Sequence, residues 1–230
     1  MKTKNFLILL FNIIIATNFF AQSPDKFISQ TKTQLNNVKF YDNTKAQNLI
    51  NNNVFSYKIS EKLMTTVVIT TTNDFTCIDC YTYISVFVFK KNNNTWQLIE
   101  KKIKLHAISK YGMIPLKEEI MFKTLTDTTF LMYYELVDNK NTFSIARLKT
   151  YYFTGTKLVN SGEIIIGKNN SISINNPNEL NVWQAEYTIK KLNNNLPKII
   201  LNVSGYKGQN TYTNQKVYIF DKKENKFIEI

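Results

Sequence analysis

The alternation of apolar and polar residues constrains the fold of this chain most strongly. From Val54 onward the period is two, which is the pattern of half-buried β-strands. The run over 82–90 places aromatic residues on one strand face and β-branched residues on the other. The run over 65–72 is rich in Thr, Val and Ile, which fit a pleated surface. We therefore expect strands over 54–230.

Short polar segments rich in Asn, Asp and Lys separate these strands. Asn and Asp favour turns because they tolerate a positive φ angle. Breaks this short predict antiparallel hairpins, since parallel pairing needs long crossovers. The predicted fold is all-β, a mainly antiparallel β-hairpin meander. Two hairpins, at 88–99 and 219–230, resemble outer strands of β-propeller blades, so an open sheet, a sandwich and an incomplete propeller-like stack remain alternatives. The six breaks are 91–94, 126–127, 138–141, 167–170, 192–195 and 221–225.

A short helical segment is predicted before the strands. Ser23, Pro24 and Asp25 have the composition of a helix start. Apolar residues at helical spacing predict a helix over about 24–35, and a weaker one after Asn43 that ends at the Asn run 51–53. We thus expect an N-terminal helical segment and linker over 22–53 and a β domain over 54–230.

The first 21 residues have the features of a secretory signal peptide. Lys2 and Lys4 precede an apolar run over 6–15, and Ala21 suits a cleavage site. The run is shorter than the roughly 20 apolar residues of a membrane span. No later apolar run is long and uncharged enough to span a membrane. The prediction is an exported protein, periplasmic or extracellular, without a membrane span.

The chain is strongly basic, with a formal net charge of +12. A basic surface favours acidic partners such as nucleic acid or anionic glycan. Nucleic-acid readers rely on Arg for bidentate contacts, however, and Arg147 is the single Arg. The Lys residues are also spread along the chain. We therefore interpret the charge as a solvated Lys-rich surface and expect no nucleic-acid partner.

The two Cys residues, Cys77 and Cys80, form the sharpest local motif. In an oxidising compartment this spacing favours a structural disulfide that closes a turn. A thiol–disulfide redox site is the alternative, but such sites usually stand at a helix start, and strand and turn are predicted here. A zinc site needs about four ligands, and His106 is the single His. We expect no metal and no cofactor.

Residues for catalysis are sparse. His106 would need a hydroxyl or carboxylate partner that the fold supplies. The acid pairs Glu118–Glu119 and Asp74–Asp79 are the other candidates for hydrolysis. We assign no catalytic residue and expect a non-enzymatic protein, with a secreted or periplasmic hydrolase as an alternative.

Aromatic residues are numerous, with 13 Tyr, 16 Phe and 2 Trp. Each of the pairs Tyr133–Tyr134 and Tyr151–Tyr152 places one ring on each sheet face, so surface rings suited to sugar stacking or protein recognition are expected. Trp183, Tyr134 and Tyr152 are the candidate binding residues, whereas Trp96 is expected in the core. The interpretation is an exported non-catalytic module that binds an envelope protein or polysaccharide. An inhibitor or immunity-type partner of a secreted enzyme is a further alternative.

Overall fold

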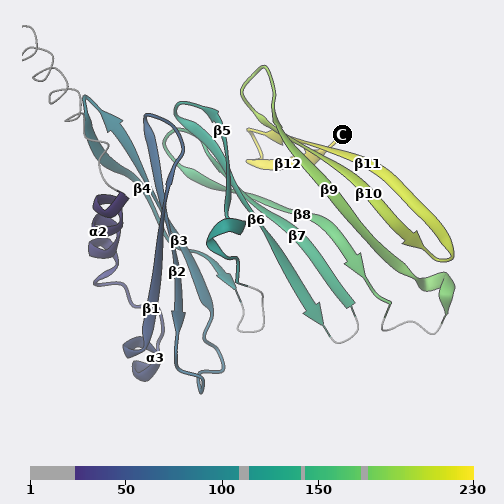
Figure 1. The fold of residues 1–230 in the computed structure, drawn as a ribbon, viewed down its shortest axis with the longest axis horizontal. Helices are drawn as coiled ribbons and strands as arrows, with labels where there is room; N and C mark the ends of the chain where they lie inside the picture. The colour runs from purple at the N-terminus through teal and green to yellow at the C-terminus, as the bar shows by residue number, and fades with distance from the viewer. Residues whose placement is uncertain (1–23, 109–113, 141–142, 172–175) are drawn as a thin grey trace, which may run out of the picture. The chain divides into compact units, whose positions relative to one another are not determined.

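The computed structural model describes residues 24–108, 114–140, 143–171 and 176–230 (Figure 1). The chain divides into two compact units, Met1–Val38 and Lys39–Ile230, and the twelve described strands belong to the second unit. The predicted signal peptide over 1–21 lies outside the described residues and stays a prediction.

The predicted N-terminal helix is present as α2, Pro24–Leu35. Its buried side chains are Phe27, Thr31 and Leu35. Their spacing of four places them on one helical face, which accounts for the apolar period in the sequence.

The second helix is shorter than predicted. It is α3, Thr44–Asn48, and the side chain of Asn43 caps its first backbone N–H groups. Strand β1, Ile50–Lys58, then begins before the Asn run 51–53, which was expected to end the helical segment. That run pairs in register with β2 of the first sheet, so sheet formation overrides the turn preference of Asn.

The first sheet is an antiparallel meander of four strands in chain order. Strands β2 and β3 are buried on both faces along most of their length. This explains their nearly continuous apolar and Thr-rich sequences. The strands are β1, β2 (Leu63–Thr72), β3 (Thr82–Asn92) and β4 (Thr95–Ile108).

The second sheet is an antiparallel meander of eight strands, also in chain order. Figure 1 shows it in teal, green and yellow. Two short 3-10 helices, η1 (Lys117–Glu119) and η2 (Pro177–Glu179), precede β5 and β9. The strands are β5 (Met121–Thr126), β6 (Thr129–Lys140), β7 (Phe143–Phe153), β8 (Leu158–Asn169), β9 (Asn181–Lys191), β10 (Pro197–Lys207), β11 (Asn210–Asp221) and β12 (Lys226–Glu229).

Asn residues shape several of the tight turns. Asn93, Asn94, Asn195 and Asn225 have φ between 44° and 65°, the left-handed region that Asn tolerates. The break predicted over 167–170 is displaced, because β8 continues to Asn169 and pairs there with β7 and β9. The strand expected over 172–174 lies outside the described residues.

A shared hydrophobic core joins the two sheets. It includes Val67 and Val86 from the first sheet and Phe130 and Tyr151 from the second, each at most 1% exposed. Smaller clusters cover other parts of the second sheet. The fold is therefore all-β and antiparallel, as predicted, and consists of two open sheets with a short helical segment.

Candidate binding groove

A groove of about 780 Å³ crosses the second sheet where β8 and β9 meet. These two strands pair through only three positions, Gly167–Asn169 against Val182–Gln184, whereas β9 and β10 pair along their whole length. The groove is lined by residues of β6 to β11 and therefore crosses this narrow junction.

A row of three residues forms the centre of the groove. Gly205 of β10 pairs with Trp183 on one side and with Tyr212 on the other, so the three positions share one sheet face. Trp183 is half-buried and packs against a cluster of apolar residues in the second sheet. The row combines a largely apolar surface with aromatic rings that remain partly open to solvent.

Gly205 is required at this position by close packing. A Cβ atom there would lie 2.2 Å from the carbonyl oxygen of Val182 and 2.7 Å from the Cβ atom of Trp183. Both distances are far shorter than van der Waals contact. The missing side chain therefore lets β9 approach β10 closely and places Trp183 over the glycine.

Two lysines flank the aromatic row. Lys168 lies opposite Trp183 in the β8–β9 register, and Nζ of Lys207 lies 3.8 Å from the centroid of the Tyr212 ring. Within the described ranges neither lysine forms an ion pair. The carboxylate that lines the groove, Glu135, accepts a hydrogen bond of 2.9 Å from the hydroxyl of Tyr187.

Polar residues complete the lining, and hydroxyl and amide groups can donate and accept hydrogen bonds. Those next in sequence to the row direct their side chains to the opposite sheet face. Beyond the row, at the outer end of β9 and β10, a second hollow of about 630 Å³ is lined mainly by amides and Lys207. The polar lining residues of the groove are Ser144, Asn169, Gln184, Ser204, Thr211 and Thr213.

The structure separates the three residues predicted to bind. Trp183 lines the groove, but Tyr134 and Tyr152 are only 1% and 6% exposed. The expectation that these two rings lie at the surface is wrong. The second sheet is packed on both faces at this point, so Tyr134 enters the core between the sheets and Tyr152 enters a separate cluster. Their predicted binding role remains untested.

Trp96 also differs from its expected place. It follows the hairpin turn at the start of β4 and pairs with Lys91 at the end of β3. Its side chain is half-buried rather than part of the fully buried core. The end of a hairpin covers fewer ring atoms than the middle of a sheet does.

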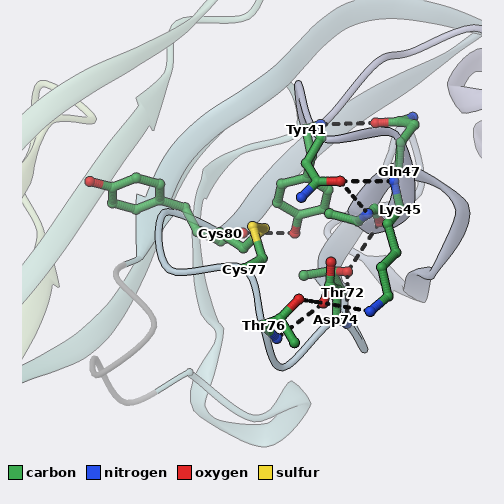
Figure 2. Close-up of a disulfide and its surroundings, with 11 residues drawn as sticks. Tyr41, Lys45, Gln47, Thr72, Asp74, Thr76, Cys77 and Cys80 are labelled. Carbon is green, nitrogen blue, oxygen red and sulfur yellow. Dashed lines mark hydrogen bonds and ion pairs between the residues drawn. A yellow bond between two sulfur atoms is a disulfide. The ribbon is translucent and has the colours of Figure 1, made fainter.

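The predicted disulfide between Cys77 and Cys80 is present, and no Cys is free. Figure 2 shows it closing a turn between β2 and β3. The Cα atoms are 5.5 Å apart, and Cys80 is followed by strand β3. This is the strand-and-turn context from which a structural bridge was predicted.

The loop that contains the disulfide is anchored by buried polar contacts (Figure 2). The side chain of Asp74 accepts hydrogen bonds from the backbone N–H and the hydroxyl of Thr76 at 3.0 and 2.6 Å, and lies 3.9 Å from Nζ of Lys45. The hydroxyl of Tyr41 donates to the carbonyl of Tyr81 at 2.8 Å. These contacts hold both sides of the bridge.

The candidate catalytic residues do not line the groove. Nδ1 of His106 lies 2.7 Å from the hydroxyl of Tyr134, and burial, followed by the charge of Lys149, lowers the pKa of His106. The pair Glu118–Glu119 belongs to η1, where Glu119 accepts a hydrogen bond from the backbone of Leu116. In the described part of the chain, no group of three or more His, Cys, Asp or Glu residues is arranged to hold a metal.

Sequence reasoning missed Gly205, Tyr212 and the two lysines that flank the aromatic row. One signal was available, because a lone glycine in the alternating strand 197–207 indicates close backbone approach. The sequence contains no signal that distinguishes the two lysines, since Lys is frequent throughout the chain.

Among the described residues, the helices are too short or too polar to cross a membrane. Comparisons with protein-family models, curated proteins and solved structures found no match to this chain.

Proposed function

We propose that this protein is an exported, non-catalytic binding module that recognises a protein or polymer of the cell envelope through the groove around Trp183. The observation that supports this proposal most directly is the row Trp183–Gly205–Tyr212 in an open groove. Binding sites of this kind combine an apolar floor with a few oriented polar groups.

The chemistry of the row supports recognition. Trp and Tyr rings supply large rigid contact areas at a low cost in side-chain entropy. The amides of Asn181 and Asn210, which share the sheet face of the rings, can fix the orientation of a ligand. The close packing at Gly205 keeps Trp183 in place, and preorganisation of this kind favours affinity.

We assign no catalytic step to the groove. The His106 ring is hydrogen-bonded to Tyr134, which belongs to the core between the sheets. Glu135 is engaged by Tyr187. These contacts favour binding over hydrolysis as the role of the protein.

A titration of envelope extract tests the proposal. Trp96→Phe leaves Trp183 as the sole Trp, because the chain has two, so after labelling with 5-fluorotryptophan its fluorine NMR signal reports on the groove and is distinct from the proteins of the extract. We expect a saturable change in this Trp183 signal on addition of extract. Extract divided into protease-treated and glycosidase-treated portions separates a protein ligand from a polysaccharide.

Two variants locate the binding site. Trp183→Leu keeps apolar packing but removes the aromatic face, and should abolish retention of the ligand in a pull-down. Trp96→Leu changes the other half-buried Trp and should leave retention unchanged. If folded Trp183→Leu protein retains the ligand as well as the wild type does, the groove is not the binding site.

A further inference from the structure

We infer that the groove binds an anionic glycan, a chain of sugar rings that carry carboxylate or sulfate groups. This inference rests on the proposed function and specifies its ligand. Three observations support it: the aromatic row, the two lysines that form no ion pair with any described residue, and the amide-rich hollow that continues the groove.

The aromatic row suits a sugar ring. The C–H faces of a pyranose are apolar and pack on the flat face of Trp or Tyr, while its hydroxyls need hydrogen-bond partners at the ring edge. Asn181 and Asn210 stand two positions from Trp183 and Tyr212, so their amides share the face of the row and can supply such partners. A purely apolar ligand would leave these groups desolvated without a partner, which costs free energy.

The charges favour an acidic sugar over a neutral one. Lys168 and Lys207 flank the row, and within the described ranges neither forms an ion pair. The groove's carboxylate is held by Tyr187, as described above. Without Lys2 and Lys4 of the predicted signal peptide, the formal net charge falls from +12 to +10, which still adds a long-range attraction for polyanions.

The second hollow favours a chain over a single sugar. It begins at Asn181 and Lys207, which are next in sequence to the groove residues Val182 and Tyr206. Its remaining lining is rich in amides, which hydrogen-bond to hydroxyl groups, and contains one carboxylate, that of Glu179. A ligand that extends from the aromatic row would therefore meet a cation first and amides next.

A single-stranded nucleic acid is also a stacking polyanion, but the structure favours it less. The single Arg of the chain, Arg147, pairs with Asp138 and Glu163. It is therefore engaged within the protein and does not line the groove. An oligonucleotide is included in the test as the competing polyanion.

The test uses the mature chain with Trp96→Phe, so that Trp183 emission reports binding. The probes are hexamers of galacturonate, hexamers of mannuronate, heparin-derived hexasaccharides, the carboxyl-reduced galacturonate hexamer and a single-stranded oligonucleotide. We expect saturable binding of at least one anionic glycan, and binding at least tenfold weaker for its uncharged or charge-reduced counterpart. Affinity should fall with added salt, because ions screen the exposed charges.

Charge removal at matched sites completes the test. Lys168→Gln with Lys207→Gln should weaken binding of the anionic glycan at least tenfold and flatten its salt dependence. The control is Lys190→Gln with Lys198→Gln, which removes two lysines that face each other at the other end of β9 and β10. The control should bind as the parent does.

The outcomes separate this inference from the proposed function. If no glycan binds, if the neutral hexamer binds equally well, or if the oligonucleotide binds more tightly, the inference is wrong. The proposed function still stands in those cases if an envelope component is retained through Trp183. If neither glycans nor envelope extract affects Trp183, both fail.

Discussion

The Nδ1 atom of His106 lies 2.7 Å from the hydroxyl oxygen of Tyr134, and this contact joins β4 of the first sheet to β6 of the second. Tyr134 is almost fully buried, and His106 is partly buried. A buried hydroxyl needs a hydrogen-bond partner, because leaving it unpaired in the core costs free energy. The single His of the chain therefore links the two sheets.

We expect His106 and Tyr134 to be energetically coupled. In a cycle of His106→Leu, Tyr134→Phe and the double variant, the loss in the free energy of unfolding should be smaller for the double variant than for the summed single variants. The coupling should be about 1 kcal/mol, the usual net value of a hydrogen bond. Urea unfolding measures it, and strictly additive losses would contradict the assignment.

The same His predicts a loss of stability in acid. Burial lowers the pKa of folded His106, the positive Lys149 lowers it further, and Glu163 opposes them. The unfolded chain therefore takes up a proton first as the pH falls below about 6.5. Stability should be full above that pH and fall below it.

Urea midpoints of tag-free protein between pH 7.5 and 5.5 measure this effect. Because the chain has one His, His106→Gln should remove most of the pH dependence in this range. A wild-type midpoint that rises as the pH falls would show that folding favours the charged imidazole.

Gly205→Ala should be far more destabilising than Gly167→Ala. The new Cβ at 205 would lie 2.2 Å from backbone of β9, so the strands must separate, at a cost of about 1–3 kcal/mol. At 167 the nearest atoms are 3.4 Å away, which is an ordinary contact. Both glycines line the groove, so thermal unfolding of the two variants compares packing at the same site. Equal melting temperatures would contradict the close approach of β9 to β10.

Cys77→Ser with Cys80→Ser should lower the free energy of unfolding by about 2 kcal/mol, the loop-entropy value for so short a loop. The anchored side chains of Asp74 and Tyr41 should keep the folded loop in place. Ligand binding should be unchanged, because the bridge does not line the groove.

In the wild-type protein, thiol labelling under denaturing conditions and without reduction should find no free thiol. Turnover of a dithiol substrate would instead favour a redox role.

The fold could be predicted from the sequence because short stretches of residues determine where each strand and each turn lies. Alternation identifies each strand, and Asn-rich turns such as Asn93–Asn94 pair it with the next. The groove could not be predicted in this way, because it depends on how strands meet across β8 and β9. Periodicity assigned Tyr134 to a sheet face, but it could not show that a second sheet covers that face.

The strand order has a consequence for how the chain folds. Within each sheet every strand pairs with its neighbour in sequence, so each of these pairings joins strands that are adjacent along the chain. Short loops lose little entropy on closure, and a low contact order favours rapid folding. We expect faster refolding than for a Greek-key sandwich of equal length. If the chain is exported as proposed, each hairpin can also form as it leaves a secretion channel, before the rest of the chain has emerged.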